Sequence, residues 1–252
     1  MGMLKCRLAD TREYLKIITA NGFVTAYGPQ TMSTPAQDLL FIALAQIGQC
    51  DTTLYEYRIS VPQFAKATGR QRDYIYDIAD RIVDECLTTR FYASYKEAKN
   101  KEIDGFPLYS RIRYNNGNFI FKLNLELADY VLNQMAGYVQ TKLGDILKMK
   151  SQYAISMYRL IQARLLPRSQ PPKNKAIRGY LSVDDIRAAT GTLDRYERIN
   201  NLHKKVIIPA LKDIEQHGHI MVDMKPKLSG HRIVGYNVTL RVMEEGYIVI
   251  LN

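Results

Sequence analysis

The chain has 252 residues, and its 35 Lys and Arg side chains outnumber its 25 Asp and Glu side chains, which gives a formal net charge of +10. With 46% hydrophobic and 24% charged residues, it has the composition of a globular protein of one or two domains. No apolar run reaches the ~18 residues that a membrane span needs, the N-terminus lacks the features of a secretory signal, and the three cysteines form no CxxC pair. We therefore expect a cytoplasmic protein without a membrane span, a disulfide framework or a zinc cluster.

The positive charge is concentrated toward the C-terminus. Residues 1–150 hold 19 basic and 16 acidic side chains, whereas residues 151–252 hold 16 basic and 9 acidic ones. The net charges of the two segments are therefore +3 and +7. Such an asymmetry predicts a polyanionic partner such as nucleic acid.

The first half predicts a helix, a short helix, a longer helix and a hairpin, in this order. Residues 36–48 are strongly apolar and are expected to form the first helix. Residues 60–69 predict the short helix and residues 72–87 the longer one. In residues 105–123, an Asn-Gly pair lies between Arg-Ile-Arg at residues 111–113 and Phe-Ile-Phe at residues 119–121, which is typical of a β-hairpin turn.

The second half predicts the same order. Helices are expected over residues 151–165, 182–191 and 195–216, and strands over residues 219–224 and 233–242. Residues 225–230, Lys-Pro-Lys-Leu-Ser-Gly, predict the loop that joins these strands. Residues 164–179 are rich in proline and basic side chains and predict a mobile loop.

Residues 60–69 and 182–191 are two copies of one pattern. Both read Ser-Val-x-x-Φ-x-x-Ala-Thr-Gly, where Φ is Phe64 in the first copy and Ile186 in the second. The serine of each copy can cap a helix by accepting a backbone N–H. The glycine of each copy can adopt the positive φ that ends a helix. The pattern therefore predicts two equivalent short helices.

Helix, short helix, turn, longer helix and β-hairpin follow one another in a winged helix-turn-helix, and this order occurs twice. We predict an α+β protein made of two tandem winged-helix domains, residues 1–148 and residues 149–252. The second domain carries most of the excess positive charge, so we expect it to provide the main sequence-specific DNA contacts. In this motif the second helix of the turn pair enters the major groove.

In the second domain, this recognition helix is expected over residues 195–216. Wound at 100° per residue, its apolar side chains fall on one face. The opposite face carries the side chains that we expect to read bases, namely Arg198, Asn201, Lys204 and Lys205. Arg and Lys can donate to guanine, and Asn can pair with adenine. Arg195 is expected to contact the DNA backbone. His203 winds toward the edge of the core, so we expect it to pack or to contact phosphate and not to bind a metal.

In the first domain, the matching helix has a different face. Opposite its apolar side it carries four carboxylates, at Asp73, Asp77, Asp80 and Asp84. These would repel DNA phosphates along the helix. Only its start, with Arg70 and Arg72, suits DNA, so we expect the first domain to contact the backbone weakly or to contact protein.

The two hairpins, or wings, supply further basic side chains. We expect phosphate contacts from Arg111, Arg113 and Lys122 in the first wing, and from Lys225, Lys227 and Arg232 in the second, with His231 beside them. Such contacts position a protein on DNA but carry no sequence information.

In residues 119–127, 150–160, 181–187, 196–198 and 202–214, the chain resembles the initiator proteins of iteron-containing plasmids. The resemblance runs from about residue 14 to residue 242. Its most specific segments are residues 181–187, 196–198 and 202–214, and residues 150–160 and 119–127 match as well.

The resemblance implies that monomers bind tandem direct repeats, or iterons, in double-stranded DNA at a replication origin and help to open the adjacent AT-rich duplex. It also implies a homodimer, joined through the first domain, that represses its own gene at an inverted repeat. The implied partners are the host initiator ATPase, the replicative helicase and chaperones in the bacterial cytoplasm. In the family, base contacts come mainly from the second domain's recognition helix, which matches Arg198, Asn201, Lys204 and Lys205. His203 stands where the family usually has a basic residue.

An enzyme is the first alternative. A rolling-circle nickase needs two histidines around a hydrophobic residue and a nucleophilic tyrosine, but the one His pair, His217 and His219, encloses a glycine. No GxxxxGK[ST] motif for ATP occurs either. We therefore expect no catalysis, no cofactor and no metal, although counting cannot exclude a nucleophile among 18 tyrosines.

Two non-enzymatic alternatives stay open. A tandem winged-helix transcriptional repressor would use the same recognition helix as an initiator, so only the arrangement of the DNA sites separates the two. A structural or interaction protein with an incidental basic face would bind DNA without the steep salt dependence of phosphate neutralisation.

Overall fold

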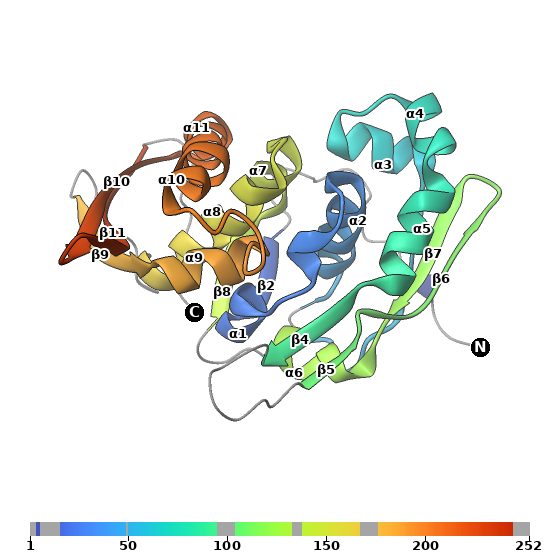
Figure 1. The fold of residues 1–252 in the computed structure, drawn as a ribbon. Coiled ribbons are helices and arrows are strands. Elements are labelled where there is room, and N and C mark those ends of the chain that lie inside the picture. Colours follow the sequence, from blue (N-terminus) through green and yellow to red (C-terminus); the bar gives the residue numbers. More distant parts are fainter. Residues whose placement is uncertain are drawn as a thin grey trace. The chain divides into compact units, whose positions relative to one another are not determined.

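A computed structural model describes residues 4–5, 16–48, 50–94, 104–132, 138–166 and 176–243. The chain divides into two compact units, Met1–Lys148 and Met149–Asn252 (Figure 1). Within the described residues, no helix is long and apolar enough to cross a membrane.

In its described residues, the first unit combines helices with three small groups of strands. Its helices are α1 (Asn21–Thr25), α2 (Thr34–Ala45), α3 (Val61–Thr68), α4 (Arg72–Asp77), α5 (Ala79–Thr88), α6 (Ala128–Val131) and α7 (Leu143–Lys148), with short 3-10 turns at Pro29–Thr31 and Leu125–Leu127. Its strands are β1 (Leu4–Lys5), β2 (Lys16–Ala20), β3 (Glu56–Ser60), β4 (Arg90–Ser94), β5 (Asp104–Pro107), β6 (Tyr109–Asn115), β7 (Asn118–Leu123) and β8 (Tyr138–Lys142). The main sheet has the order β1-β3-β7-β6, and the pairs β2-β8 and β4-β5 are separate.

The core of the first unit lies around α2, which is buried over nearly its whole length. Aromatic rings from the other elements pack together below the helix-turn-helix. Phe64 of α3 lies 5.9 Å from Phe119 of β7, and Tyr57 of β3 lies 6.0 Å from Phe121, between ring centroids. These contacts fix the short helix of the first repeat onto the wing strands, as the inward position of Phe64 predicts.

The helix predicted over residues 72–87 is interrupted, which corrects that expectation. Ile78 has φ −111° and ψ 7°, so the chain forms α4 and then α5. Asp80 lies in the first turn of α5, where a carboxylate favours a helix N-terminus. Ile75, Ile78 and Ile82 are still buried, and an apolar spacing alone therefore does not reveal the break.

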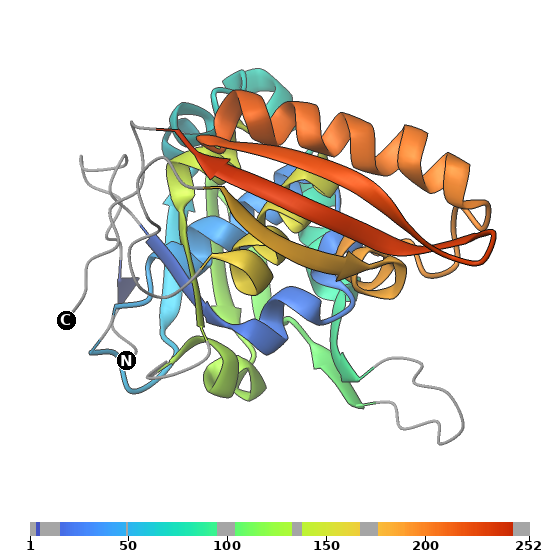
Figure 2. The ribbon, with the colours of Figure 1, turned by 90° about the vertical axis from the view of Figure 1, so that its left-hand side faces the viewer.

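The second unit is a compact winged helix. Its helices are α8 (Gln152–Leu165), α9 (Val183–Thr190), α10 (Ile199–Leu202) and α11 (Ile208–His217), and the five residues His203–Ile207 between α10 and α11 form a π-helical turn. Its strands are β9 (Ile177–Ser182), β10 (Ile220–Ser229) and β11 (Arg232–Val242), in the order β10-β11-β9. Figure 2 shows these strands in front, with the helices of the unit behind and above them.

Both copies of the ten-residue pattern form capped short helices, as predicted. Ser60 accepts a hydrogen bond from the backbone N–H of Gln63, and Ser182 accepts one from that of Asp185. The side chains of Gln63 and Asp185 in turn accept hydrogen bonds from the backbone N–H groups of Ser60 and Ser182, which completes two capping boxes. The closing glycines have φ 69° and 65°, in the left-handed region.

The start that we predicted for the recognition helix of the second unit is wrong. The recognition helix begins at Ile199 and not at residue 195. The π-helical turn within this helix comes just before Pro209. A proline inside a helix has no backbone N–H to donate, and its ring clashes with the carbonyl four residues earlier, so a regular α-helical turn is disfavoured there.

The predicted loop at residues 225–230 is also wrong, because β10 continues to Ser229 and the hairpin turns at Gly230, which has φ 59°. Pro226 is tolerated since β10 is an edge strand. Of the predicted mobile loop at residues 164–179, the first residues end α8 and residues 177–179 begin β9. The residues between them, 167–175, lie outside the described part of the chain.

Candidate nucleic-acid interface

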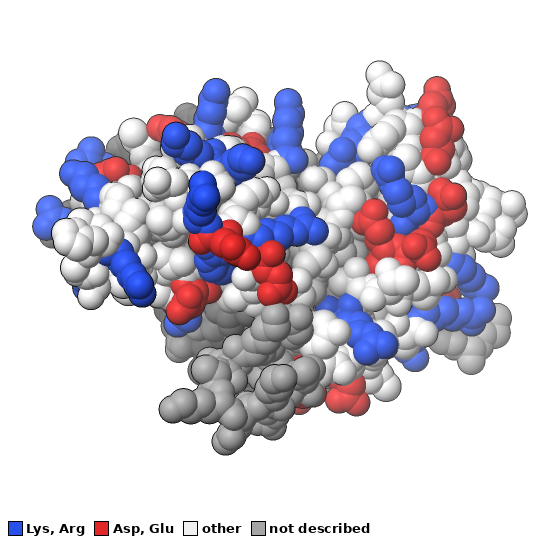
Figure 3. Space-filling model, in the orientation of Figure 1, with Lys and Arg blue, Asp and Glu red and all other residues white. Residues whose placement is uncertain are grey.

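The helix formed by α10, the π-helical turn and α11 separates buried apolar side chains from exposed polar ones. Its buried side chains are Leu202, Val206, Ile207, Ala210 and Ile214. The four side chains predicted to read bases, Arg198, Asn201, Lys204 and Lys205, are all exposed. Figure 3 shows Lys and Arg side chains gathered over this region of the second unit. The fold therefore leaves these donors free to meet a ligand at the start of the helix.

Arg198 occupies the N-cap position of α10, and no side-chain hydrogen bond caps this end. The first N–H groups of a helix carry a partial positive charge and need acceptors. Phosphate oxygens can supply such acceptors. Arg195 is exposed but lies before the helix, in the segment that links α9 to α10.

This linking segment is held by a side chain to which the sequence assigned no role. Arg187 of α9 donates hydrogen bonds to the backbone carbonyl oxygens of residues 192, 195, 196 and 197, at 3.0, 2.7, 2.8 and 3.2 Å. Arg187 lies in one of the segments that resemble the plasmid initiators, and only that position in the motif could have drawn attention to it.

His203 packs within the protein, which agrees with the packing alternative for this residue. It is partly buried, and its ring stacks on Tyr236 of β11 with centroids 5.7 Å apart and an interplanar angle of 7°. Among the described residues, no group of three or more His, Cys, Asp and Glu side chains could hold a metal ion.

The wing of the second unit has a basic outer face, on the side of the sheet away from the buried core. Lys225 pairs in register with Asn237 and Lys227 with Gly235, so both lysines lie on this face. The amino group of Lys227 lies 4.8 Å from the centroid of the Tyr180 ring. Tyr180, which was not predicted, donates a hydrogen bond of 3.1 Å to the carbonyl of Val234.

Gly235 leaves room for this tyrosine. A Cβ atom at that position would lie 2.3 Å from the Tyr180 hydroxyl oxygen and 2.5 Å from the Leu181 carbonyl oxygen. Arg232 and His231 are exposed near the turn of the same hairpin. The wing thus holds Lys227 beside an aromatic ring and keeps its charge accessible.

We expect Lys227→Ala to weaken binding to every duplex sequence by a similar factor, because a phosphate contact carries no base information. The slope of log K against log salt should become shallower by about 1. Fluorescence anisotropy with two unrelated duplexes over a salt series measures both quantities. A loss confined to one sequence would show that Lys227 reads a base instead.

In the first unit, the predicted wing residues share the outer face of the main sheet. Arg111 and Arg113 of β6 are exposed, and Lys122 of β7 is partly exposed opposite Arg111. Arg58 of β3 joins this face, donating to the Asn118 side chain at 3.0 Å, although it was not predicted. Its place in the alternating strand sequence Glu-Tyr-Arg-Ile-Ser could have identified it. Arg113 lies 3.9 Å from Glu56, a partly exposed and therefore weak ion pair.

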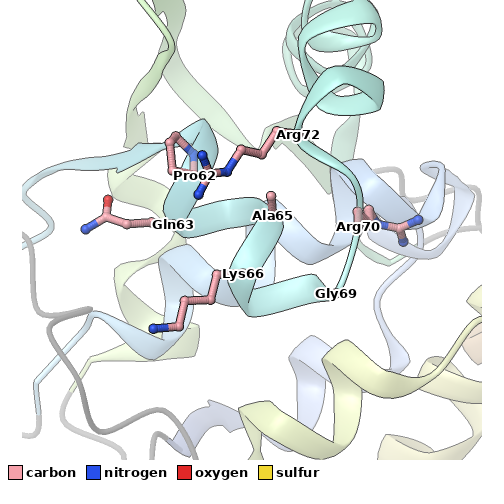
Figure 4. A pocket seen from close by; sticks show the side chains of 7 residues that line it. All are labelled: Pro62, Gln63, Ala65, Lys66, Gly69, Arg70 and Arg72. Carbon is pink, nitrogen blue, oxygen red and sulfur yellow. The ribbon is translucent and has the colours of Figure 1, made fainter.

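A shallow pocket of about 460 Å³ lies on the first unit's helix-turn-helix. It is lined by Pro62, Gln63, Ala65, Lys66, Gly69, Arg70 and Arg72. Figure 4 shows Arg72 extending over Pro62, Gln63 and Lys66 reaching outward from α3, and Arg70 pointing away from them. The sequence-based prediction included Arg72 but missed Gln63 and Lys66.

Arg70, predicted to contact DNA backbone, is paired inside the protein. Its guanidinium donates to one carboxylate oxygen of Asp38 in α2 at 2.9 and 3.2 Å. Burial raises the pKa of the Asp38 carboxyl to about 7, although Arg70 opposes this shift. A lone carboxylate in an apolar helix was the sequence signal for such a pair. The pair ties α2 to the turn between α3 and α4.

The acidic face predicted for the first unit is present. Asp73, Asp77, Asp80 and Asp84 are all exposed on α4 and α5. Figure 3 shows acidic side chains gathered over this region. The two units therefore present opposite charges at equivalent positions of their helix-turn-helix motifs.

Comparisons with known proteins agree with this architecture. The family described as "Initiator Replication protein, WH1" matches residues 16–162, and that described as "Initiator Rep protein, WH2" matches residues 182–240. A search of curated proteins gives no significant match.

A solved structure with a TM-score of 0.74 has the same fold. The structure titled "Crystal structure of Pi initiator protein in complex with iteron DNA" covers 94% of this chain and 100% of its own, with a TM-score of 0.74 and 17% identity. A structure of domains 2 and 3 of RctB covers 75% of each chain with a TM-score of 0.42 and 12% identity. On the family matches and the two winged-helix units, the chain belongs to the initiator replication protein family.

Proposed function

We propose that the chain is a plasmid replication initiator that binds double-stranded DNA in the bacterial cytoplasm and acts by binding rather than by catalysis. The observation that carries this proposal is the exposed, basic start of the helix formed by α10 and α11, in a chain of the initiator family. In this proposal Arg198, Asn201, Lys204 and Lys205 read bases, because they are the exposed donors on the helix that enters the major groove.

The remaining basic side chains would hold the backbone. In the second unit these are Arg195, Lys225, Lys227 and Arg232, and in the first unit Arg72, Arg111, Arg113 and Lys122. Arg70 would contribute less than was expected, since its guanidinium is already paired with Asp38. The carboxylates on α4 and α5 support a weaker DNA contact for the first unit.

The finer parts of the proposal concern assembly. Monomers would bind tandem direct repeats beside an AT-rich tract, and a dimer joined through the first unit would repress the chain's own gene at an inverted repeat. The host initiator ATPase, the replicative helicase and chaperones would be the protein partners. The structure titled as a Pi initiator with iteron DNA supports direct repeats as the DNA to try first.

A nuclease footprint on the DNA that flanks the chain's own gene, repeated over a salt series, tests the proposal. We expect protection of several direct repeats spaced by whole helical turns. If about 6 phosphates are neutralised, log K should fall with log salt with a slope near −5. Protection of a lone inverted repeat would support a repressor instead. A flat salt dependence would leave a structural protein as the better explanation.

A further inference from the structure

The linking segments of the two helix-turn-helix motifs differ in length. In the first unit, residues 70–71 separate the glycine that closes α3 from the first residue of α4. In the second unit, residues 192–198 separate the corresponding glycine from the first residue of α10. A longer segment has more conformations to lose. The second unit therefore needs contacts that fix this segment before the recognition helix can start at a defined place.

Arg187 supplies such contacts. Its Nη1 donates to the carbonyls of Thr192 and Arg195, and its Nη2 donates to those of Tyr196 and Glu197. Each terminal nitrogen carries two N–H donors, so the four hydrogen bonds use all the N–H donors of the two terminal nitrogens. These donors point into the protein backbone, and the guanidinium is thereby turned away from a direct DNA role.

A second contact holds the same segment from another side. Tyr196 has φ 54°, a left-handed conformation that is uncommon for a residue other than glycine. Its hydroxyl lies 3.5 Å from that of Tyr153 in α8. The turn therefore holds an unfavourable backbone conformation, which the surrounding contacts must stabilise.

The internal repeat provides a comparison within one molecule. In the ten-residue pattern, Arg187 of the second copy corresponds to Ala65 of the first. Ala65 has no hydrogen-bonding side chain, and it lies in the unit whose linking segment has only two residues. The guanidinium and the long segment thus occur together in the unit that carries the basic recognition helix.

From these observations we infer that Arg187 is a positioning residue that sets the base discrimination of the recognition helix. By holding the carbonyls between residues 192 and 197, it fixes where α10 begins and where Arg198 projects. The inference rests on the proposed function, because it assigns Arg187 a part in sequence-specific binding. Lysine cannot replace arginine here, since a single ammonium group cannot form this four-bond fork.

The variants Arg187→Lys and Arg187→Met test the inference. Their affinities for the best footprinted duplex and for a scrambled duplex of equal length are measured by anisotropy at one salt concentration. We expect the ratio of the two affinities to fall by about tenfold to a hundredfold, the range for one misplaced base contact. Binding to the scrambled duplex should change by no more than about twofold, because the phosphate contacts remain. Unchanged discrimination in both variants would overturn the inference. An equal loss on both duplexes would assign Arg187 to the fold or to phosphate binding, which also overturns it.

Arg164→Met is the matched control. Arg164 forms an exposed ion pair of 3.0 Å with Asp185 of α9, so the variant removes one positive charge beside the same helix without touching the linking segment. We expect it to keep the wild-type discrimination. A loss equal to that of Arg187→Met would show that charge near α9, and not the fork, is responsible.

Hydrogen exchange separates failure of this inference from failure of the proposed function. In Arg187→Lys, amides of residues 192–198 should exchange at least about tenfold faster than in the wild type, while those of α2 stay unchanged. If wild-type protein discriminates no duplex, the proposed function fails, and this exchange still shows whether Arg187 fixes the segment. Unchanged exchange in the variant would contradict the inference whatever the DNA result.

Discussion

Double replacement of Arg198 and Lys204 by Ala is expected to remove most of the discrimination between the specific site and unrelated DNA. Both side chains are exposed at the start of the recognition helix. One good base contact contributes about 1–3 kcal/mol of discrimination, so the loss of two should cost about 2–6 kcal/mol. Competition binding with single-base variants of the footprinted site would measure this loss and locate the positions affected.

Lys212→Ala is the matched control for this experiment. Lys212 is exposed on α11 of the same helix but lies beyond the π-helical turn, away from the first turns that we propose to enter the groove. It should change discrimination by less than about twofold. The proposed orientation of the helix would be wrong if Arg198→Ala alone left the preferred sequence and its affinity unchanged.

The stability of the first unit is expected to fall as pH rises from about 4 to about 8. The Asp38 carboxyl has a pKa of about 7 when buried in the folded chain, compared with a usual value of 3.8. Between these values the folded state binds a proton that the unfolded state has lost, so stability decreases with rising pH. The difference of about three pH units corresponds to about 4 kcal/mol. Urea unfolding followed by circular dichroism at several pH values would measure the slope.

Asp38→Asn isolates this contribution from every other titrating group. The carboxamide keeps an oxygen that can accept from Arg70, but it cannot ionise. The variant should therefore lose the decline of stability between pH 4 and 8 while the wild type retains it. Asp73→Asn, at an exposed position on α4, should behave like the wild type. Equal slopes for Asp38→Asn and the wild type would mean that Asp38 is already ionised at low pH.

Sequence patterns predicted the elements whose structure depends on neighbouring residues. The two serine caps and the two left-handed glycines, which were predicted, involve hydrogen bonds that span three or four residues. Helical winding correctly predicted the exposed positions of Arg198 and Asn201, before the π-helical turn, and of Lys204 and Lys205 within it. The base-reading role of these side chains stays a prediction. Features of this kind depend on residues that are close together in the chain, so they can be predicted from the sequence alone.

The errors have causes that lie outside such local patterns. Residues 225–229 contain a proline and therefore resemble a loop, but their place at the edge of the sheet allows a strand. The pairing of Arg70 with Asp38 joins residues 32 positions apart, which no periodicity reveals. The bonds of Arg187 to backbone carbonyls do not depend on the identity of the side chains in that segment. Each of these features depends on contacts that form only when the chain is folded.

The separation of buried and exposed side chains on the helix that contains the π-helical turn at residues 203–207 has a consequence for how the proposed DNA target could change. In this helix, Val206 and Ile207 of the turn are buried together with Leu202, Ala210 and Ile214. Arg198, Asn201, Lys204 and Lys205 are exposed. Substitutions at the exposed positions therefore leave the core packing of the helix intact. Under the proposed function, a lineage could thus acquire preference for a new repeat by substitutions at the exposed positions 198, 201, 204 and 205 without losing a folded intermediate.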